Sequence, residues 1–91
     1  MEISFNVLTW QEGKMFVAYV PELDVSSCGK TLDEAQKNIY EAVQIFLQQT
    51  EKMGTLQEIL EESGFGKKKN NNQIRWLPPR MISTQREKIA I

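Results

Sequence analysis

The sequence predicts an α+β protein in which an antiparallel β-sheet packs on one long and one short helix, in the order β-β-β-α-α-β. Three observations support this fold class. A strand-like start is followed by a glycine turn and an apolar return segment, residues 15–20. Two helical segments with start and stop signals then fill residues 31–64. A short apolar segment near Trp76 supplies the last strand.

The predicted first strand, residues 3–10, carries Ile3, Phe5 and Val7 in alternation with polar residues. Such alternation is typical of a strand with one buried face, because successive side chains point to opposite faces. Gly13 can adopt positive φ and so favours a turn into residues 15–20. The two strands are therefore predicted to form a hairpin.

Pro21 should end the pairing of the second strand, since proline has no backbone N–H. Residues 22–24 then cross over to a third short strand, predicted for residues 25–28. Gly29 permits the bend from that strand into the first helix.

The first helix has a strong start signal. Thr31 occupies an N-cap position and Glu34 follows three residues later, the spacing of a capping box. Gly54 is a suitable stop. The apolar residues between these signals recur every three or four positions, which places them on one face; they are Leu32, Ala35, Ile39, Val43 and Phe46.

The second helix repeats these signals over a shorter length. Thr55 and Glu58 have the capping-box spacing, and Gly64 is the stop. Phe65 is predicted to pack back on Leu60, as in a Schellman motif.

The C-terminal part is predicted to be less regular. Gly66–Gln73 contains no apolar residue and reads as a solvated loop. Residues 74–77 suggest a short strand that two prolines end. Residues 88–91 either add another strand or remain without regular structure. We therefore predict one domain, with a core in residues 1–65 and a basic loop and short C-terminal strand or strands in residues 66–91 that complete it. No separate DNA-binding domain is predicted.

Charge divides the chain more sharply than its net value of −1 suggests. Residues 1–65 hold eleven acidic and four basic residues, a net charge of −7, whereas residues 66–91 hold one acidic and seven basic residues, a net charge of +6. Two interpretations are open: the basic end folds back on its own body, or the acidic body binds a basic partner.

The composition favours a soluble cytoplasmic protein without a membrane segment, because neither a signal peptide nor a long apolar run is visible. The single cysteine, Cys28, cannot form an intramolecular disulfide and is interpreted as a small reduced strand residue. For a chain of 91 residues, oligomerisation is a plausible further source of stability, and we expect a homo-oligomer.

Catalysis is not expected. Two-metal phosphodiester chemistry needs carboxylates that converge from different elements, and residues 3–10 contain none. The chain has no histidine, Ser26 and Ser27 have no visible base partner, and no glycine-rich phosphate loop occurs. We predict no catalytic residue, no metal and no cofactor.

The segment VAYVPELDVSSCGKTLDEAQKNIYEA resembles the HicB-like antitoxins of bacterial toxin–antitoxin pairs. The resemblance covers about residues 3–50. It depends on the order of a glycine-turn hairpin, Pro21-x-Leu23, and Gly29-x-Thr31-x-x-Glu34-Ala35 before a long helix.

The resemblance implies a β-β-β-α-β core of the partial ribonuclease H type. It also implies a small basic toxin of the HicA type that cleaves mRNA and that the antitoxin blocks. Many members add a C-terminal ribbon–helix–helix or helix–turn–helix domain, for which the last 26 residues after Phe65 offer no pair of amphipathic helices. Specific DNA binding by this chain alone is therefore not expected. Many relatives also have Pro-Gly where this chain has Asp24-Val25.

Four residues are candidates for partner contact. Glu22 and Asp24 form either a solvated turn or an acidic lip for partner Arg and Lys side chains. Glu41 and Ile45 lie off the apolar helix stripe, as ordinary surface residues or as part of a contact. The motif residues Pro21, Leu23, Gly29, Thr31, Glu34 and Ala35 are assigned mainly structural roles.

The leading hypothesis is an antitoxin-like protein that covers the RNA-binding surface of a basic ribonuclease. The alternatives are a stand-alone ligand-binding or regulatory module with the same core, and a residual metal-dependent nuclease. Trp10 and Trp76 are interpreted as core or edge packing, with one of them possible in an interface. Lys67–Lys69 are interpreted as part of a solvated loop, since no aromatic residue is interleaved with them.

Overall fold

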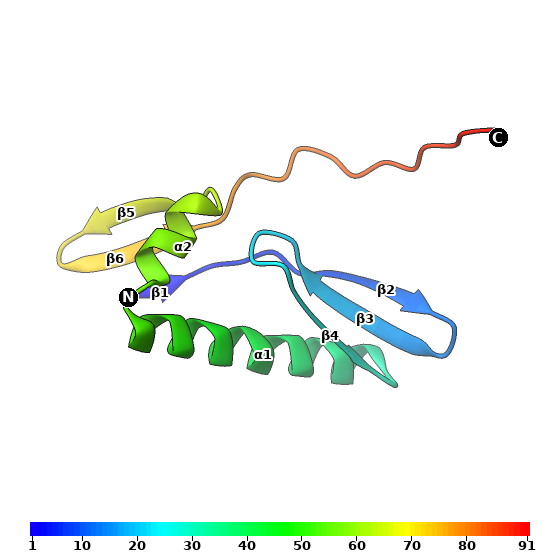
Figure 1. The fold of residues 1–91 in the computed structure, drawn as a ribbon, viewed down its shortest axis with the longest axis horizontal. Coiled ribbons are helices and arrows are strands. Elements are labelled where there is room, and N and C mark those ends of the chain that lie inside the picture. The colour runs from blue at the N-terminus through cyan, green and yellow to red at the C-terminus, as the bar shows by residue number, and fades with distance from the viewer.

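The predicted α+β fold class is confirmed by a computed structural model that describes all 91 residues (Figure 1). Six strands form two three-stranded sheets, with strand orders β2-β3-β4 and β1-β6-β5. The elements are β1 (Glu2–Ile3), β2 (Leu8–Glu12), β3 (Met15–Val20), β4 (Val25–Gly29), α1 (Leu32–Met53), α2 (Leu56–Glu62), β5 (Gly66–Asn70) and β6 (Gln73–Leu77). All ladders are antiparallel except β1–β6, which is parallel.

The first strand is divided between the two sheets, where the sequence predicted one continuous strand. β1 pairs with β6, and β2 pairs with β3. Between them, the backbone N–H of Asn6 donates to Glu22 Oε1 at 2.9 Å. This partly buried carboxylate satisfies an N–H that has left both ladders, and so it stabilises the crossing of the chain from one sheet to the other.

We expect Glu22→Ala to lower the free energy of unfolding by about 1 kcal/mol, because the Asn6 N–H would lose its partner in a half-buried position. The urea midpoint measures this change. Glu41→Ala, which removes an exposed glutamate from α1, is the matched control and should stay within about 0.5 kcal/mol of the parent. Equal effects of the two substitutions would contradict the role of Glu22.

The predicted N-cap and glycine stop of α1 are confirmed, although only the Thr31 half of the capping box is formed. The Glu34 N–H donates to Thr31 Oγ1 at 3.1 Å, and Thr31 has the extended backbone of an N-cap. At the other end Gly54 is left-handed, with φ 75°. The N–H groups of Gly54 and Thr55 donate to the Glu51 and Thr50 carbonyls, which completes a Schellman motif.

The predicted capping box at the start of α2 does not form. Thr55 has φ −108° and ψ −1°, and its side chain makes no cap bond to α2. Thr55 instead takes part in the C-terminal motif of α1. Its N–H donates to the Thr50 carbonyl, and its hydroxyl donates to the same oxygen at 3.4 Å. The C-terminal motif of α2 is confirmed, because the Phe65 N–H bonds the Leu60 carbonyl and both side chains are buried.

The predicted solvated loop at residues 66–73 is also wrong. Gly66–Asn70 forms β5, which pairs with β6 around a two-residue turn, Asn71–Asn72. Both asparagines have positive φ, 50° and 75°, as a type I′ hairpin turn requires. The strand was missed because all five of its residues are exposed and none is apolar. The predicted strand at residues 74–77 is confirmed as part of β6.

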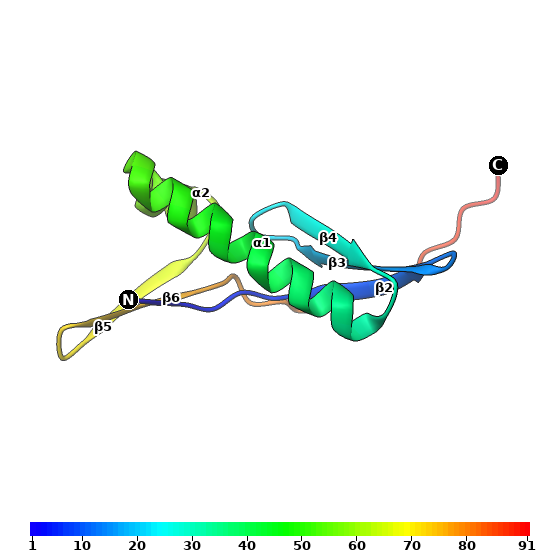
Figure 2. The same cartoon turned by 90° about the horizontal axis from the view of Figure 1, so that it is seen from below.

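One core joins the two sheets to the helices. α1 packs across β4 and β3, and α2 lies beside the β5–β6 pair (Figures 1 and 2). Residues 80–91 form no helix or strand and are exposed. The buried apolar residues come from β3, β6, both helices and two connecting segments: Ala18, Val20, Leu23, Ala35, Ile39, Val43, Leu56, Leu60, Phe65 and Trp76.

Candidate functional site

The sheet β2-β3-β4 has one covered face and one uncovered face. Ala18 and Val20 of β3 are fully buried on the side that α1 covers. Because side chains alternate along a strand, Val17 and Tyr19 point to the opposite side. The register Trp10↔Val17 puts Trp10 on that side as well. We call this surface, away from α1, the outer face.

The outer face presents a band of apolar and aromatic side chains. Trp10 is 41% exposed, and Met15 at the start of β3 is also exposed. Leu8, Val17 and Tyr19 are half-buried. The Trp10 and Tyr19 rings meet edge to face, with centroids 6.3 Å apart and an angle of 71° between their planes. Aromatic rings of limited side-chain entropy, clustered in this way, are typical anchors of protein interfaces.

Carboxylates border this band and are held in place by its aromatic rings. Trp10 Nε1 donates to Glu12 Oε1 at 3.0 Å. The Tyr19 hydroxyl donates to Asp24 Oδ1 at 2.9 Å. Each carboxylate keeps lone pairs free, since a carboxylate accepts several hydrogen bonds. The outer face therefore combines apolar contact area with fixed negative charge, which suits a partner rich in Arg and Lys.

The pKa of Tyr19 is raised above its ordinary value of 10.0. The main cause is the hydrogen bond to Asp24, which only the neutral phenol can donate; desolvation and the charges of Asp24 and Glu22 add to it. Because the folded pKa lies above the unfolded one, the stabilisation is present below the unfolded pKa and is lost as pH rises through the folded pKa.

We expect Asp24→Asn to lower the pKa of Tyr19 toward 10.0, because the largest cause of its elevation is removed. Asparagine tolerates the positive φ of 54° at this position, so the turn is preserved. Titration followed by near-ultraviolet absorbance measures the change, and the same titration of Tyr19→Phe identifies the Tyr19 contribution. An unaltered Tyr19 titration in Asp24→Asn would contradict the assigned hydrogen bond.

The structure separates the four predicted contact residues into two pairs. Glu22 and Asp24 lie in the turn before β4, next to the outer face, although Glu22 also bonds the Asn6 N–H. Glu41 and Ile45 are exposed one helical turn apart on α1, and Ile45 is 54% exposed. α1 itself separates this second pair from the sheet, so no single flat surface contains all four residues.

The six motif residues have identifiable structural positions. Pro21 ends β3, and Leu23 enters the core. Gly29 lies against the first turn of α1, where Ala35 is buried. Thr31 and Glu34 form the N-cap bond.

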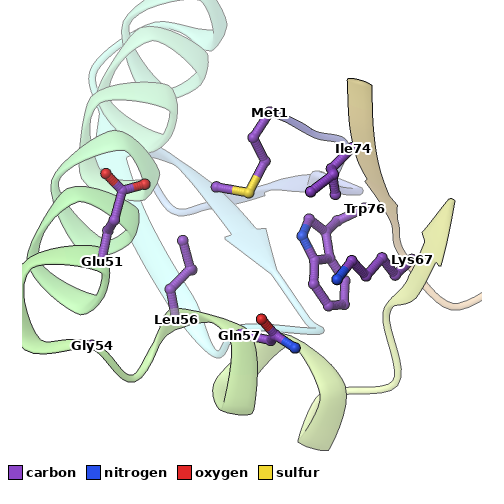
Figure 3. Close-up of a pocket in the computed structure, with 8 residues that line it drawn as sticks. All are labelled: Met1, Glu51, Gly54, Leu56, Gln57, Lys67, Ile74 and Trp76. Carbon is purple, nitrogen blue, oxygen red and sulfur yellow. The ribbon is translucent and has the colours of Figure 1, made fainter. Parts of the chain in front are cut away.

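A pocket of about 250 Å³ lies on the other side of the molecule, between the α1–α2 corner and the β1-β6-β5 sheet (Figure 3). Leu56, Ile74 and Trp76 supply apolar walls, and the side chain of Met1 points into the space between them. Lys67 Nζ lies 5.8 Å from the Trp76 ring centroid, a cation–π distance. Glu51 and Gln57 complete the lining.

No group of three or more His, Cys, Asp or Glu side chains is placed to hold a metal ion. None of the helices combines the length and the hydropathy needed to cross a bilayer.

Sequence reasoning missed most of the outer face. The sequence predicts mainly a packing role for Trp10, and it identifies Met15, Val17 and Tyr19 only as parts of an apolar strand. The signal was present in residues 15–20, MFVAYV, where no position is polar. In a two-faced antiparallel sheet, such a strand places apolar residues on both faces.

Comparison of the chain with protein-family models, curated proteins and solved structures gives no match.

Proposed function

We propose that this protein is an antitoxin-like binding protein that neutralises a small basic mRNA-cleaving toxin of the HicA type. The observation that supports the proposal most directly is the outer face, where exposed apolar and aromatic side chains are bordered by carboxylates. The resemblance of the Pro21-x-Leu23 and Gly29-x-Thr31-x-x-Glu34-Ala35 segments to HicB-like antitoxins is the reason for proposing a toxin of the HicA type as the partner.

The proposed mechanism is competition for a basic surface. A protein that binds RNA phosphates needs Lys and Arg side chains on its binding face. Glu12 and Asp24 would attract those cations, and Glu22 would add to the negative potential. Trp10, Met15 and Val17 would then exclude water by apolar contact. RNA could not reach the toxin while this face covers it.

The test is genetic and biochemical. We expect a short reading frame for a basic protein beside this gene, whose product inhibits growth. Co-expression of the present chain should restore growth, and the two proteins should co-purify as a complex that excludes RNA. Absence of such a neighbour, together with failure to co-purify any small basic protein, would overturn the proposal.

A second candidate, a stand-alone ligand-binding module, has the Figure 3 pocket in its favour. Its walls combine Trp76 and Leu56 with a cation, Lys67, and an anion, Glu51. Ligand pockets usually measure about 300–1,000 Å³, so this pocket of about 250 Å³ suits only a very small molecule. The outer face is therefore the stronger basis for a function.

A further inference from the structure

The β5–β6 pair is a strongly basic β-hairpin, which we call the basic hairpin, residues Gly66–Leu77. It extends from one end of the molecule, beyond α2, in both views (Figures 1 and 2). It carries Lys67, Lys68, Lys69 and Arg75 and no acidic residue. The sequence between Glu62 and Glu87 contains no Asp or Glu at all.

Two cations of the basic hairpin lie directly opposite each other. The register pairs Lys68 with Arg75, and Lys67 with the buried Trp76. Lys68 and Arg75 therefore share the face that points away from the core, where both are exposed. Like charges at directly opposite positions destabilise a strand pair. Glu2 of β1 is the register partner of Arg75 on its other side and offsets part of that charge, whereas no carboxylate flanks Lys68 on the edge strand β5. An anion bound across this pair would remove the repulsion.

The tip of the basic hairpin is rich in amides. Asn70 and Gln73 form the last strand pair, and Asn71 and Asn72 form the turn. All four are exposed. Each amide side chain offers both donors and an acceptor, which suits phosphate oxygens and the edges of bases.

The cations gather at the middle of the basic hairpin, because Lys67–Lys69 are consecutive in β5 and Arg75 lies opposite Lys68. Two residue steps of a strand span roughly 7 Å, so the exposed Lys68 and Arg75 can contact neighbouring phosphates of one polymer. A two-stranded β-ribbon fits the B-DNA major groove, which is about 12 Å wide, whereas the major groove of A-form RNA is too narrow for side chains to read.

We propose that the basic hairpin binds duplex DNA, with Lys68 and Arg75 on phosphates and the amide tip in the major groove. This site lies outside the outer face, so it is independent of toxin neutralisation. The contacts are mainly to phosphates, and the binding is therefore salt-dependent and of low sequence specificity. The absence of a helical DNA-binding domain from the sequence is compatible with this mode.

The experiment measures binding of the full chain to a fluorescent duplex of about 20 base pairs, by anisotropy over a series of salt concentrations. Each phosphate contact contributes about 0.9 to the slope of log K against log salt. We expect the double variant Lys68→Gln, Arg75→Gln to reduce that slope by nearly 2 and to weaken binding at least tenfold at about 0.1 M salt. It leaves Lys67 over Trp76, and circular dichroism checks that the fold is retained.

The matched control is Arg86→Gln, Lys88→Gln, which removes the same two charges from the exposed C-terminal segment. We expect its slope to change by clearly less than that of the hairpin variant. Equal losses in the two variants would show that net charge, not the hairpin, binds the DNA. Absence of parental binding at low salt, or equal affinity for a double-stranded RNA of the same length, would also overturn the proposal.

Discussion

Trp10→Ala is expected to weaken binding of the proposed basic toxin by about thirtyfold or more, equivalent to at least about 2 kcal/mol. Trp10 is the most exposed aromatic residue of the outer face, and it touches Tyr19 and holds Glu12. The substitution therefore removes apolar contact area and also frees a carboxylate from its fixed position. The dissociation constant of the complex, measured by calorimetry with the co-purifying toxin, tests this prediction.

The matched control for Trp10 is Tyr40→Ala. Tyr40 is an aromatic residue of α1 that is 56% exposed, and it does not belong to the outer face. We expect its affinity for the toxin to match that of the parent. A large loss in Tyr40→Ala with little loss in Trp10→Ala would move the interface from the outer face to the helix.

Gly29→Ala is expected to lower the free energy of unfolding by about 2–3 kcal/mol. Gly29 lies at the end of β4, directly beneath the first turn of α1. An added Cβ would lie 2.6 Å from the Ala35 nitrogen and 2.9 Å from Glu34 Cβ. The close neighbours include helix backbone, so the strand and the helix would have to move apart. For a chain of this size, the melting temperature should fall by roughly 10 °C or more.

Gly66→Ala is the matched control for this substitution. A Cβ at Gly66 would meet nothing within 4 Å, and its φ is not positive. Alanine should leave the melting temperature unchanged or slightly higher, because it reduces the freedom of the unfolded chain. If calorimetry finds both variants equally stable, the close contact between β4 and α1 is not a determinant of stability.

The sequence predicted the parts of the fold whose signals are local. The glycine stops at Gly54 and Gly64, the cap at Thr31 and the apolar stripe of α1 all depend on residues within a few positions of one another. The structure confirms the two stops and the cap, and it buries Ala35, Ile39 and Val43 of the stripe, whereas Leu32 in the first turn of α1 is 43% exposed. Thr55 does not cap α2 because its hydrogen bonds to the end of α1 fix its conformation. The spacing of Thr55 and Glu58 alone gives no sign of this constraint.

The wrong prediction for residues 66–73 and the missed outer face have a common physical cause. In both cases, the structure depends on how separate elements pack or pair, which local sequence patterns do not show. β5 is a strand because β6 pairs with it, and its exposed lysines give no apolar pattern that could predict this. Lysine on an edge strand also discourages pairing with another chain, which favours it at this position. The outer face was missed for a related reason, because only the position of α1 determines which face of β3 stays uncovered.

The short parallel ladder between β1 and β6 has a consequence for how the molecule folds. It joins Glu2 and Ile3 to Arg75 and Trp76, close to the two ends of the ordered structure. Pairing of β1 with β6 closes a loop of about 70 residues. The entropic cost of closing this loop must be offset before the pairing can stabilise the folded chain. During synthesis, the β2-β3-β4 hairpins and α1 leave the ribosome well before β6. The outer face can therefore form while the β1-β6-β5 sheet is still incomplete, and we expect assembly of that sheet to be the final step of folding.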